Sequence, residues 1–419
     1  MNKVIIIGAG AAGLLAAALA SGYENEVIVI EKNEKPGKKL YITGKGRCNL
    51  TNACDRDEMM ANIISNNRFM YSSFNSFNNY DVMDLFENLG VPLKVERGMR
   101  VFPESDKSSD IITALEKECL RKNVKFMYRT KVAGLCYEAV ENSKDDKKPS
   151  KRVTGVRLED GRELPADSVI VATGGLSYPS TGSTGDGYNF ARSAGHNVTK
   201  CYPSLVSLKI KEGFCADMAG LSLKNVRVAV QKNGKELYSG FGEMLFTHTG
   251  VSGPLILSCS ATAGISCDGA ELSIDLKPAL DSEKLDERLV RDLSADSHKQ
   301  LKSVLRGLLP ASMVPVFVKK TGLDETVMAG NVTRENRQKI VSVMKNFTMN
   351  ICGLGGYNEA VVTKGGIDVK QINPATMESK LCSNLYFAGE VLDIDAFTGG
   401  FNLQIAWSTA AAAARAVLK

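Results

Sequence analysis

Histidine and tryptophan are scarce in this chain, and the cysteine spacings typical of metal sites are missing. Only three histidines and one tryptophan occur among the 419 residues. The ten cysteines form no Cys-x-x-Cys pair, the closest two being Cys48 and Cys54, and no histidine stands near them at the spacing of metal ligands. A zinc site is therefore unexpected, and we predict no metal.

Long apolar stretches and blocks of like charge are also missing. No run of about 18 or more uncharged apolar residues occurs, so we predict no membrane-spanning helix. The opening residues, MNKVIIIGAG, lack the basic segment, long apolar stretch and cleavage site of a secretory signal, so we expect a cytoplasmic protein with free thiols. Basic residues outnumber acidic ones by only 52 to 47, without a run of five like charges, so no nucleic-acid partner is expected.

The chain is long enough for two or three domains, and its first 31 residues have the pattern of a βαβ unit. The apolar run at 3–7 predicts a buried strand, and a helix of small residues ending at Gly22 follows it. Between them lies Gly8-x-Gly10-x-x-Gly13, whose glycines allow a tight turn and close approach of a pyrophosphate to the helix N-terminus. A second strand at 26–31 ends in Glu31, which can accept hydrogen bonds from ribose hydroxyls and would repel a 2′-phosphate.

This motif does not distinguish NAD from FAD, but two later segments favour FAD. A hairpin with an Asp160-Gly161 turn leads into the strand VIVATGG at 169–175, a second signature of many FAD-binding chains. Near the C-terminus a strand at 385–388 ends in Gly389-Glu390, and Gly399-Gly400 precede a helix at 402–418. The positive N-terminus of that helix would stabilise reduced flavin at the pyrimidine edge of its ring.

The remaining sequence predicts an insertion within the nucleotide-binding domain. Residues 59–122 are expected to be mainly helical, with a loop at 97–106, and 205–275 to form short strands. We predict three parts, which are an FAD-binding domain of residues 1–195 plus 351–419, a β-rich insertion domain of 196–280 plus 341–350, and a charged helical subdomain of 281–340.

Several long tracts resemble one known family. They are TGKGRCNLTN (43–52), RVFPESDKSSDI (100–111), ATGGLSYPSTGSTGDGY (172–188), LFTHTGVSGPLIL (245–257) and most of 363–407. In these tracts the chain resembles the BaiN/aminoacetone oxidase (RdsA-type) family of bacterial FAD-dependent flavoproteins. The resemblance implies an α/β fold, with a glutathione-reductase-like, FAD-binding Rossmann-type domain interrupted by a β-rich insertion domain that carries a helical subdomain. It also implies reduction of enones such as oxo-bile acids, or oxidation of aminoacetone.

The resemblance also implies which residues contact FAD, and adding those read from the motifs gives one predicted set. The set is Gly8, Gly10, Ala11, Ala12, Gly13, Glu31, Lys32, Gly44, Arg47, Asn49, Val132 (through its backbone, to the adenine), Thr173, Gly174, Gly389, Glu390, Gly400, Phe401, Asn402 and Gln404. One departure from the family is Ala396, where a glycine is expected. If that position needs a positive φ, alanine there would cost about 1 kcal/mol and shift the loop beside the flavin.

Five other side chains have two interpretations each. Arg47 would either balance an anion of flavin or substrate, or form a salt bridge within its loop. Cys48 would be a redox thiol or, without a partner cysteine, a packed free thiol. His248 would be an acid or base near the flavin, or a buried hydrogen-bonded residue. Ser177 and Tyr178 would orient substrate or form a turn, so the catalytic acid and base stay unassigned.

We therefore expect an FAD-dependent oxidoreductase acting on a small molecule. The first hypothesis is NAD(P)H-linked reduction of an electron-poor C=C, as in an enone; because no second complete GxGxxG occurs, NAD(P)H would dock only transiently. The alternative is an amine oxidase of the aminoacetone type that produces hydrogen peroxide. A more distant one is a tRNA-acting flavoenzyme with the helical insertion as its footprint, although acidic residues interleave with the basic ones there. A flavin-binding regulator without turnover is a further class, and the oligomeric state is left open.

Overall fold

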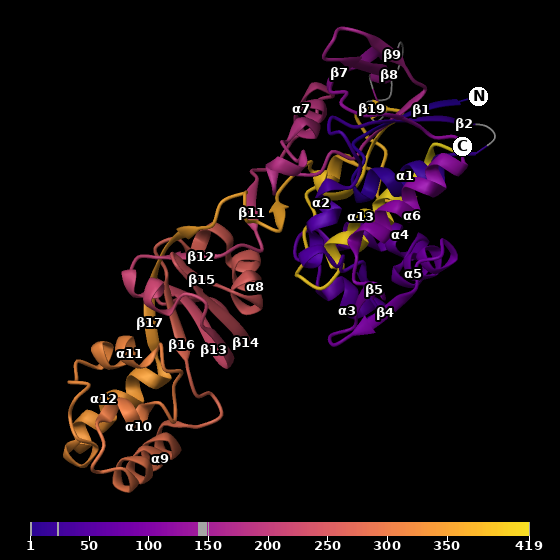
Figure 1. Ribbon diagram of the computed structural model, residues 1–419. Coiled ribbons are helices and arrows are strands. Elements are labelled where there is room, and N and C mark those ends of the chain that lie inside the picture. Colours follow the sequence, from indigo (N-terminus) through magenta and orange to yellow (C-terminus); the bar gives the residue numbers. More distant parts are fainter. Residues whose placement is uncertain (1, 23–24, 141–148, 150, 419) are drawn as a thin grey trace. The chain divides into compact units, whose positions relative to one another are not determined.

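The computed structural model describes residues 2–22, 25–140, 149 and 151–418, and divides the chain into two compact units (Figure 1). Unit 1 comprises Met1–Pro203 and Tyr357–Lys419, and unit 2 comprises Ser204–Gly356. Unit 2 is thus an insertion in unit 1. Its limits differ from the predicted insertion, which began at 196 and returned to the FAD domain at 351.

The core of unit 1 is a five-stranded sheet in the order β20-β10-β1-β2-β6, with every neighbouring pair parallel. Its strands are β1 (Asn2–Ile7), β2 (Asn25–Ile30), β6 (Lys125–Met127), β10 (Ser168–Val171) and β20 (Leu385–Phe387). Three of its helices pack together through α1, namely α1 (Ala11–Ala20), α6 (Ser108–Arg121) and α13 (Phe401–Ala416). Because the chain continues from β1 to β2 on one side and reaches β10 on the other, the carboxyl edge at β1/β10 is a topological switch point, where ligands bind in such sheets.

The segment after β2 folds into short helices and a hairpin. It contains α2 (Lys38–Ile42), η1 (Thr43–Gly46), β3 (Thr51–Asn52), α3 (Arg56–Ala61), η2 (Asn67–Phe69), α4 (Met70–Ser76), α5 (Asn79–Asn88), β4 (Leu93–Glu96) and β5 (Arg100–Pro103). The prediction of a loop at 97–106 was therefore wrong in part, because β4 and β5 pair antiparallel, with Glu96 opposite Arg100. Only the turn between them and the residues after Pro103 are irregular.

The rest of unit 1 adds a small sheet, a helix and a two-stranded pair. These are β7 (Val132–Ala139), β8 (Lys151–Leu158), β9 (Glu163–Pro165) and β19 (Cys382–Ser383), then η3 (Pro179–Thr181), α7 (Asp186–Ser193), β11 (Tyr202–Ser204), β18 (Val362–Lys364), η7 (Val369–Gln371) and η8 (Gly389–Val391). The Asp160-Gly161 turn predicted from the sequence joins β8 and β9, with Gly161 at φ 89°.

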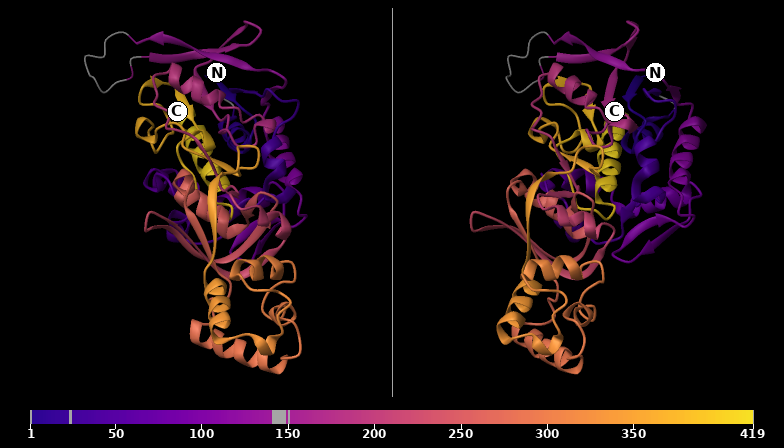
Figure 2. Two further views of the ribbon diagram at one scale, coloured as in Figure 1. Left: turned by 90° about the vertical axis from the view of Figure 1, so that its left-hand side faces the viewer. Right: turned by 60° about the vertical axis from the view of Figure 1, so that its left-hand side comes forward.

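Unit 2 is built on a closed six-stranded barrel in the order β12-β15-β14-β13-β16-β17 (Figure 2). The strands are β12 (Leu208–Ile210), β13 (Ser222–Lys232), β14 (Lys235–Thr247), β15 (Gly250–Ser252), β16 (Glu271–Asp275) and β17 (Phe347–Leu354), and the other elements are η4 (Gly213–Met218), α8 (Pro254–Ala263), η5 (Gly264–Cys267), α9 (Ser282–Ala295), α10 (Leu301–Leu305), α11 (Val314–Thr321), η6 (Ala329–Asn331) and α12 (Arg334–Lys345).

Two domain limits need correction in unit 2. Residues 341–345 were expected in the β-rich part, but they form the last turns of α12, since Ile340, Val341 and Met344 continue its buried face at helical spacing. Residues 351–354 were expected in the FAD domain, but they belong to β17, whose Ile351 pairs with Ile210 in the barrel.

No helix within the described ranges is both long and apolar enough to cross a membrane. The same residues contain no cluster of three or more His, Cys, Asp or Glu placed to hold a metal ion.

Candidate functional site at the carboxyl edge of the sheet

Three loops that are far apart in the sequence meet at the carboxyl edge of the unit 1 sheet. A Cβ placed on Gly8 would lie 2.6 Å from the carbonyl oxygen of Ala172, just after β10. A Cβ on Gly389, just after β20, would lie 2.9 Å from the Cβ of Ala12 in the first turn of α1. The structure thus brings together the glycine loop, the Ala-Thr-Gly segment and the C-terminal Gly-Glu segment, as the FAD prediction required.

The glycines of the first loop differ in what requires them. Gly8 has φ 102°, and a Cβ on Gly13 would lie 1.8 Å from the carbonyl oxygen of Gly8, so the packing of the protein itself requires both. Gly10 has φ −80° and ψ −167°, which any residue adopts, and a Cβ there would meet no described atom within 4 Å. Open space beside the second glycine is what close approach of a pyrophosphate needs.

The N-terminus of α1 is suited to an anion. Gly10 is its N-cap, no side chain in the described part of the chain caps it, and its first turn has no acidic residue. The N–H groups at the start of a helix lack partners within the helix and carry partial positive charge. The first-turn residues Ala11, Ala12 and Gly13 therefore offer donors to a phosphate.

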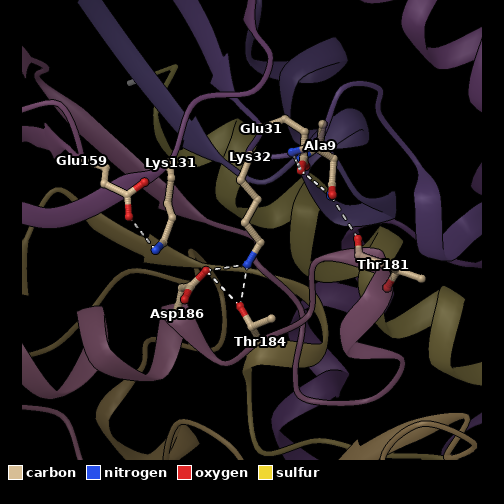
Figure 3. A network of polar contacts seen from close by, with 9 residues as sticks. Ala9, Glu31, Lys32, Lys131, Glu159, Thr181, Thr184 and Asp186 are labelled. Atoms are coloured by element: carbon tan, nitrogen blue, oxygen red, sulfur yellow. Dashed lines mark hydrogen bonds and ion pairs between the residues drawn. The ribbon is translucent and has the colours of Figure 1, made fainter.

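Glu31 follows β2, and the chain already uses its carboxylate (Figure 3). One oxygen accepts from the Ala9 N–H at 2.8 Å, and the other accepts from the backbone N–H and the side-chain amide of Asn33 at 2.8 and 2.7 Å. A carboxylate has about four acceptor positions and three are used, so about one remains for a ribose hydroxyl. Thr130 N–H donates to the Glu31 carbonyl at 3.1 Å, which brings the start of β7, with Val132, toward this end of β2.

Lys32 points to a different part of the same edge. Its ammonium group donates to the Thr184 hydroxyl at 2.5 Å and pairs with Asp186 at 2.6 Å, in the first turn of α7 (Figure 3). The cation thus joins the end of β2 to the loop that follows the Ala-Thr-Gly segment. Its predicted contact with FAD stays a prediction.

A fourth segment, residues 43–52, contacts the start of α13. A Cβ on Gly400, which has φ 100°, would lie 2.3 Å from the Thr51 carbonyl oxygen. With its amide turned to satisfy both neighbours, Asn49 accepts from the Gly400 N–H at 3.0 Å and donates to that carbonyl at 3.2 Å. The α13 N-terminus has no side-chain cap within the described residues and no acidic residue in its first turn, so it too presents positive charge.

The loop between α2 and β3 holds an unusual backbone conformation. Positive φ values occur at Gly44 (57°), Lys45 (59°), Gly46 (87°) and Cys48 (58°). Side chains other than glycine tolerate this region poorly, and such strain clusters at ligand-binding loops. This local cost fits the prediction that Gly44 and its neighbours contact the flavin.

Two predicted contacts in α13 have side chains occupied within the protein. Gln404 is buried, accepts from the Thr51 hydroxyl at 2.6 Å and donates to Ser408 at 3.0 Å. Asn402 accepts from the Ala396 N–H at 3.0 Å and donates to the Ala396 carbonyl at 2.8 Å. Phe401 is buried beside them, so these side chains position the loop before α13 and the start of the helix.

The strain expected at Ala396 does not occur. Ala396 is not among the described residues with positive φ, so a glycine is not needed there for its backbone conformation. Its side chain is fully buried, and its backbone is held by Asn402 and by a bridge to Ile63.

One interpretation of Arg47 was a salt bridge within its own loop. Arg47 does form salt bridges, but its partners lie outside that loop. Its guanidinium pairs with Glu96 of β4 and donates to Asp106 at 2.7 Å, and it lies 4.3 Å from the centre of the Phe102 ring. The hydrogen bonds that the guanidinium donates to both carboxylates raise its pKa. An additional contact with FAD or substrate stays a prediction.

Glu390 lies in a polar network that sequence reasoning missed. Its carboxylate pairs with Lys39 of α2 at 2.5 Å and accepts from the Ser177 hydroxyl at 2.7 Å and the Thr363 N–H at 2.8 Å. Burial favours the neutral acid, but the Lys39 charge and these hydrogen bonds outweigh it and hold the pKa of Glu390 below its ordinary value. Ser177 is fully buried and also contacts Lys39, so it positions this pair.

Two buried polar groups at this edge lack a hydrogen-bond partner among the described residues. They are the Thr173 hydroxyl, in the Ala-Thr-Gly segment beside Gly174 at φ 71°, and the carboxylate of Asp395, in the loop before α13. Burial raises the pKa of Asp395, although the charge of Lys364 acts in the opposite direction. An orphaned hydroxyl, open space at Gly10 and two uncapped helix ends together fit a bound dinucleotide.

For His248 and Tyr178 the sequence suggested either a catalytic or substrate-orienting role or a purely structural one, and it did so only from their positions in loops. His248 lies at the turn between β14 and β15 in unit 2 and is exposed, so it is not the buried hydrogen-bonded residue considered for it. It falls outside buried structure because the strands are joined by a tight turn at 248–249. Tyr178 has φ 50° and its N–H donates to Tyr357 O at 2.8 Å, which fits the turn interpretation.

Cys48 is a packed free thiol. It is completely buried, has no disulfide partner, and burial raises its pKa to about 12. We expect the folded protein to leave Cys48 unmodified by N-ethylmaleimide at pH 8, while exposed Cys352 reacts, and Cys48→Ala to retain its flavin. Mass spectrometry of peptides from the labelled native protein measures this. Fast labelling of Cys48, or loss of flavin reduction in Cys48→Ala with its FAD retained, would restore the redox interpretation.

Comparison with known proteins agrees with this geometry. The HI0933-like protein Rossmann domain family matches residues 2–416. A 3-dehydro-bile acid delta(4,6)-reductase of Clostridium scindens is 31% identical over 423 residues, covering 99% of each chain. A ribosomal RNA dihydrouridine synthase of Haemophilus influenzae is 32% identical over 419 residues, covering 99% of this chain and 98% of that one. The solved 3-ketosteroid delta1-dehydrogenase of Sterolibacterium denitrificans, 14% identical with a TM-score of 0.54 and full coverage of both chains, has a similar fold.

Proposed function

The chain belongs to the HI0933-like family and is an FAD-dependent oxidoreductase, and we propose that it reduces a carbon–carbon double bond conjugated to a carbonyl group, with NAD(P)H as electron donor. The observation that carries the choice of reaction is the chemistry shared by two relatives. A delta(4,6)-reductase of a 3-oxo bile acid and a dihydrouridine synthase are both named for saturating a C=C conjugated to a carbonyl.

The proposed reaction balances with the nicotinamide as reductant. Bound FAD, once reduced by NAD(P)H, would supply the hydride for the carbon β to the carbonyl, and a proton from solvent or an acid would add to the α carbon, so that one NAD(P)H is converted to NAD(P)⁺. The chain contributes binding and orientation. The N–H groups that open α1 would hold the pyrophosphate, Glu31 the ribose, and the α13 N-terminus would favour negative charge on the flavin ring.

Two substrate classes satisfy this chemistry. One is a small enone of the oxo-steroid type, which the Clostridium scindens relative supports. The other is the uracil ring of an RNA, in which C5=C6 is conjugated to the C4 carbonyl. The Haemophilus influenzae relative, 32% identical, supports it, and so does a group of exposed basic residues in unit 1 that form no ion pair with the described residues. In the amine-oxidase alternative the substrate would donate a hydride to the flavin, whereas in the proposed reductase the flavin would donate one to the substrate.

An anaerobic titration tests the proposal. The purified holoprotein is mixed with NADH, NADPH or aminoacetone, and the visible flavin absorption is followed. We expect one of the nicotinamides to bleach the flavin, and a 4-en-3-one steroid or a uridine-containing RNA to restore its colour with loss of the substrate double bond. Bleaching by aminoacetone but by neither nicotinamide would establish the oxidase instead. Bleaching by nicotinamide with no reoxidation by either acceptor class would contradict the choice of substrate chemistry.

A further inference from the structure

The positive charge of this chain is concentrated in two short segments of unit 1. Residues 31–47 and 93–107 contain ten basic and five acidic residues, a net charge of +5 in 32 residues. The whole chain has 52 basic and 47 acidic residues, also +5, so the other residues sum to zero. The helical stretch at 281–345 carries twelve basic and nine acidic residues, only +3 in 65 residues.

The two segments form one surface, which we name the α2–hairpin face (residues 35–47 with 93–107). The guanidinium of Arg47 pairs with Glu96 of β4 and with Asp106, and it lies over the ring of Phe102 in β5. The Ser108 hydroxyl at the start of α6 donates to the carbonyl of Tyr41 in α2 at 2.7 Å. The Arg47 contacts hold the end of η1 against the β4–β5 hairpin, and the Ser108 contact joins α2 to the start of α6.

The cations at the edge of this face are exposed and form no ion pair with the described residues. They are Lys35, Lys45, Arg97, Arg100 and Lys107. Among the described residues, four of the nine cations of the face pair with carboxylates, and they are Lys38, Lys39, Arg47 and Lys94. In the helical stretch seven of the twelve cations do, and they are Lys284, Arg288, Lys299, Lys302, Arg337, Lys339 and Lys345. The helical stretch, where a nucleic-acid footprint was first considered, is therefore the weaker candidate.

Large apolar side chains are exposed among these cations. Tyr41 is 53% exposed, Val95 48%, Met99 47% and Ile42 42%. The ammonium of Lys35 lies 5.5 Å from the centre of the Tyr41 ring. Exposed aromatic rings beside unpaired cations are the combination that proteins use for unstacked bases and phosphates.

We propose that the α2–hairpin face binds RNA, with its unpaired cations on backbone phosphates and the Tyr41 ring under an unpaired base. The loop at 43–49 connects this face with the predicted flavin contacts Gly44 and Asn49, so RNA held here would lie beside the reaction site. The proposal that this face binds RNA rests on the proposed function. It adds that RNA is the partner that presents the conjugated ring. It also replaces the expectation that the chain has no nucleic-acid partner.

The test measures binding to a fluorescent single-stranded, uridine-containing RNA by anisotropy across a range of salt concentrations, with oxidised holoprotein and no NAD(P)H. The variant carries Lys35→Glu, Arg97→Glu and Lys107→Glu. The control carries Lys224→Glu, Lys235→Glu and Arg334→Glu, three exposed cations of unit 2 that form no ion pair with described residues. Both triples change the net charge equally.

We expect the face variant to bind at least about ten-fold more weakly and to lose about 2 from its log–log salt slope, because about 0.7 of a counterion is released per single-strand phosphate contact. Tyr41→Ala should weaken binding by about ten-fold through lost stacking. The control should match the wild type, and FAD content should be equal in all four proteins. Because no turnover is involved, failure of the reductase test leaves this result unaffected.

Three results would overturn the proposal. One is no RNA binding by the wild type, and another is equal weakening in the face and control variants. The third is binding of vesicles rich in anionic lipid, lost in the face variant, without binding of RNA, since that would assign the face to a membrane surface.

Discussion

Replacement of Gly10 by valine is expected to lower the affinity for FAD by about 100-fold or more, equivalent to about 2.7 kcal/mol, while the protein still folds. The backbone at Gly10 is extended, a conformation that valine adopts readily, and a Cβ there meets no described atom within 4 Å. Because the Cβ position is open among the described residues, we expect the substitution to act on a bound ligand and not on the fold. Equilibrium titration of the apoprotein with FAD, followed by flavin fluorescence, gives the affinity.

Two matched variants separate this effect from general damage. Gly213→Val adds the same side chain in unit 2, where a Cβ also meets nothing within 4 Å, and should leave FAD affinity unchanged. Gly13→Ala places a methyl group 1.8 Å from the Gly8 carbonyl oxygen, so it should destabilise the fold itself. A Gly10→Val protein that binds FAD as tightly as the wild type would show that the pyrophosphate lies elsewhere.

Replacement of Glu390 by glutamine is expected to destabilise apo unit 1 by about 2 kcal/mol, less than a fully buried pair because each partner keeps about a fifth of its side chain exposed. The amide leaves the Lys39 cation without its counter-ion and turns a donor toward groups that are donors already. Lys39→Met combined with Glu390→Gln should recover part of the loss. Urea unfolding followed by fluorescence of Trp407, the single tryptophan and a buried residue of unit 1, measures it.

The pH dependence follows from the lowered pKa of Glu390. A carboxyl whose pKa is lower in the folded than in the unfolded state contributes stability that is fully present above its ordinary value of 4.5 and is lost as the pH falls through the folded value. The wild type should therefore lose stability below pH 4.5 more steeply than Glu390→Gln. If the free energy of unfolding fell equally steeply below pH 4.5 in both proteins, Lys39 and Glu390 would not interact as the structure indicates.

The parts of the site that the sequence predicted are those fixed by local backbone geometry. Gly8 and Gly13 are dictated by the tight turn between β1 and α1, and Glu31 by the end of β2, so their spacing alone locates them. The meeting of three of the distant segments follows from the parallel order of β1, β10 and β20, because carboxyl ends of parallel strands lie at one edge.

The parts that could not be predicted depend on tertiary contacts between distant residues. Lys39, Ser177, Thr363 and Glu390 lie in four separate segments, and no spacing in the chain relates them. The β4–β5 hairpin was missed because its turn places Met99 at φ 56°, a conformation for which methionine gives no signal.

The sequence also failed to predict two further features, the domain boundaries around α12 and the backbone conformation at Ala396. The sequence shows apolar residues at helical spacing that continue α12 to residue 345. The predicted β-rich part nevertheless resumed at residue 341, which is too early. The backbone at Ala396 was judged from the expected glycine, whereas hydrogen bonds exchanged with Asn402 hold a conformation there that alanine adopts without a positive φ.

One FAD is expected to bind where the glycine loop, the Ala-Thr-Gly segment, the 43–52 loop and the α13 N-terminus meet. The most direct measurement is the visible absorption spectrum of the purified wild-type protein beside Gly10→Val, with flavin released by unfolding and quantified per chain. We expect a yellow wild type with about one FAD per chain and a folded but colourless Gly10→Val protein. A well-folded wild type that stays colourless in excess FAD would contradict it.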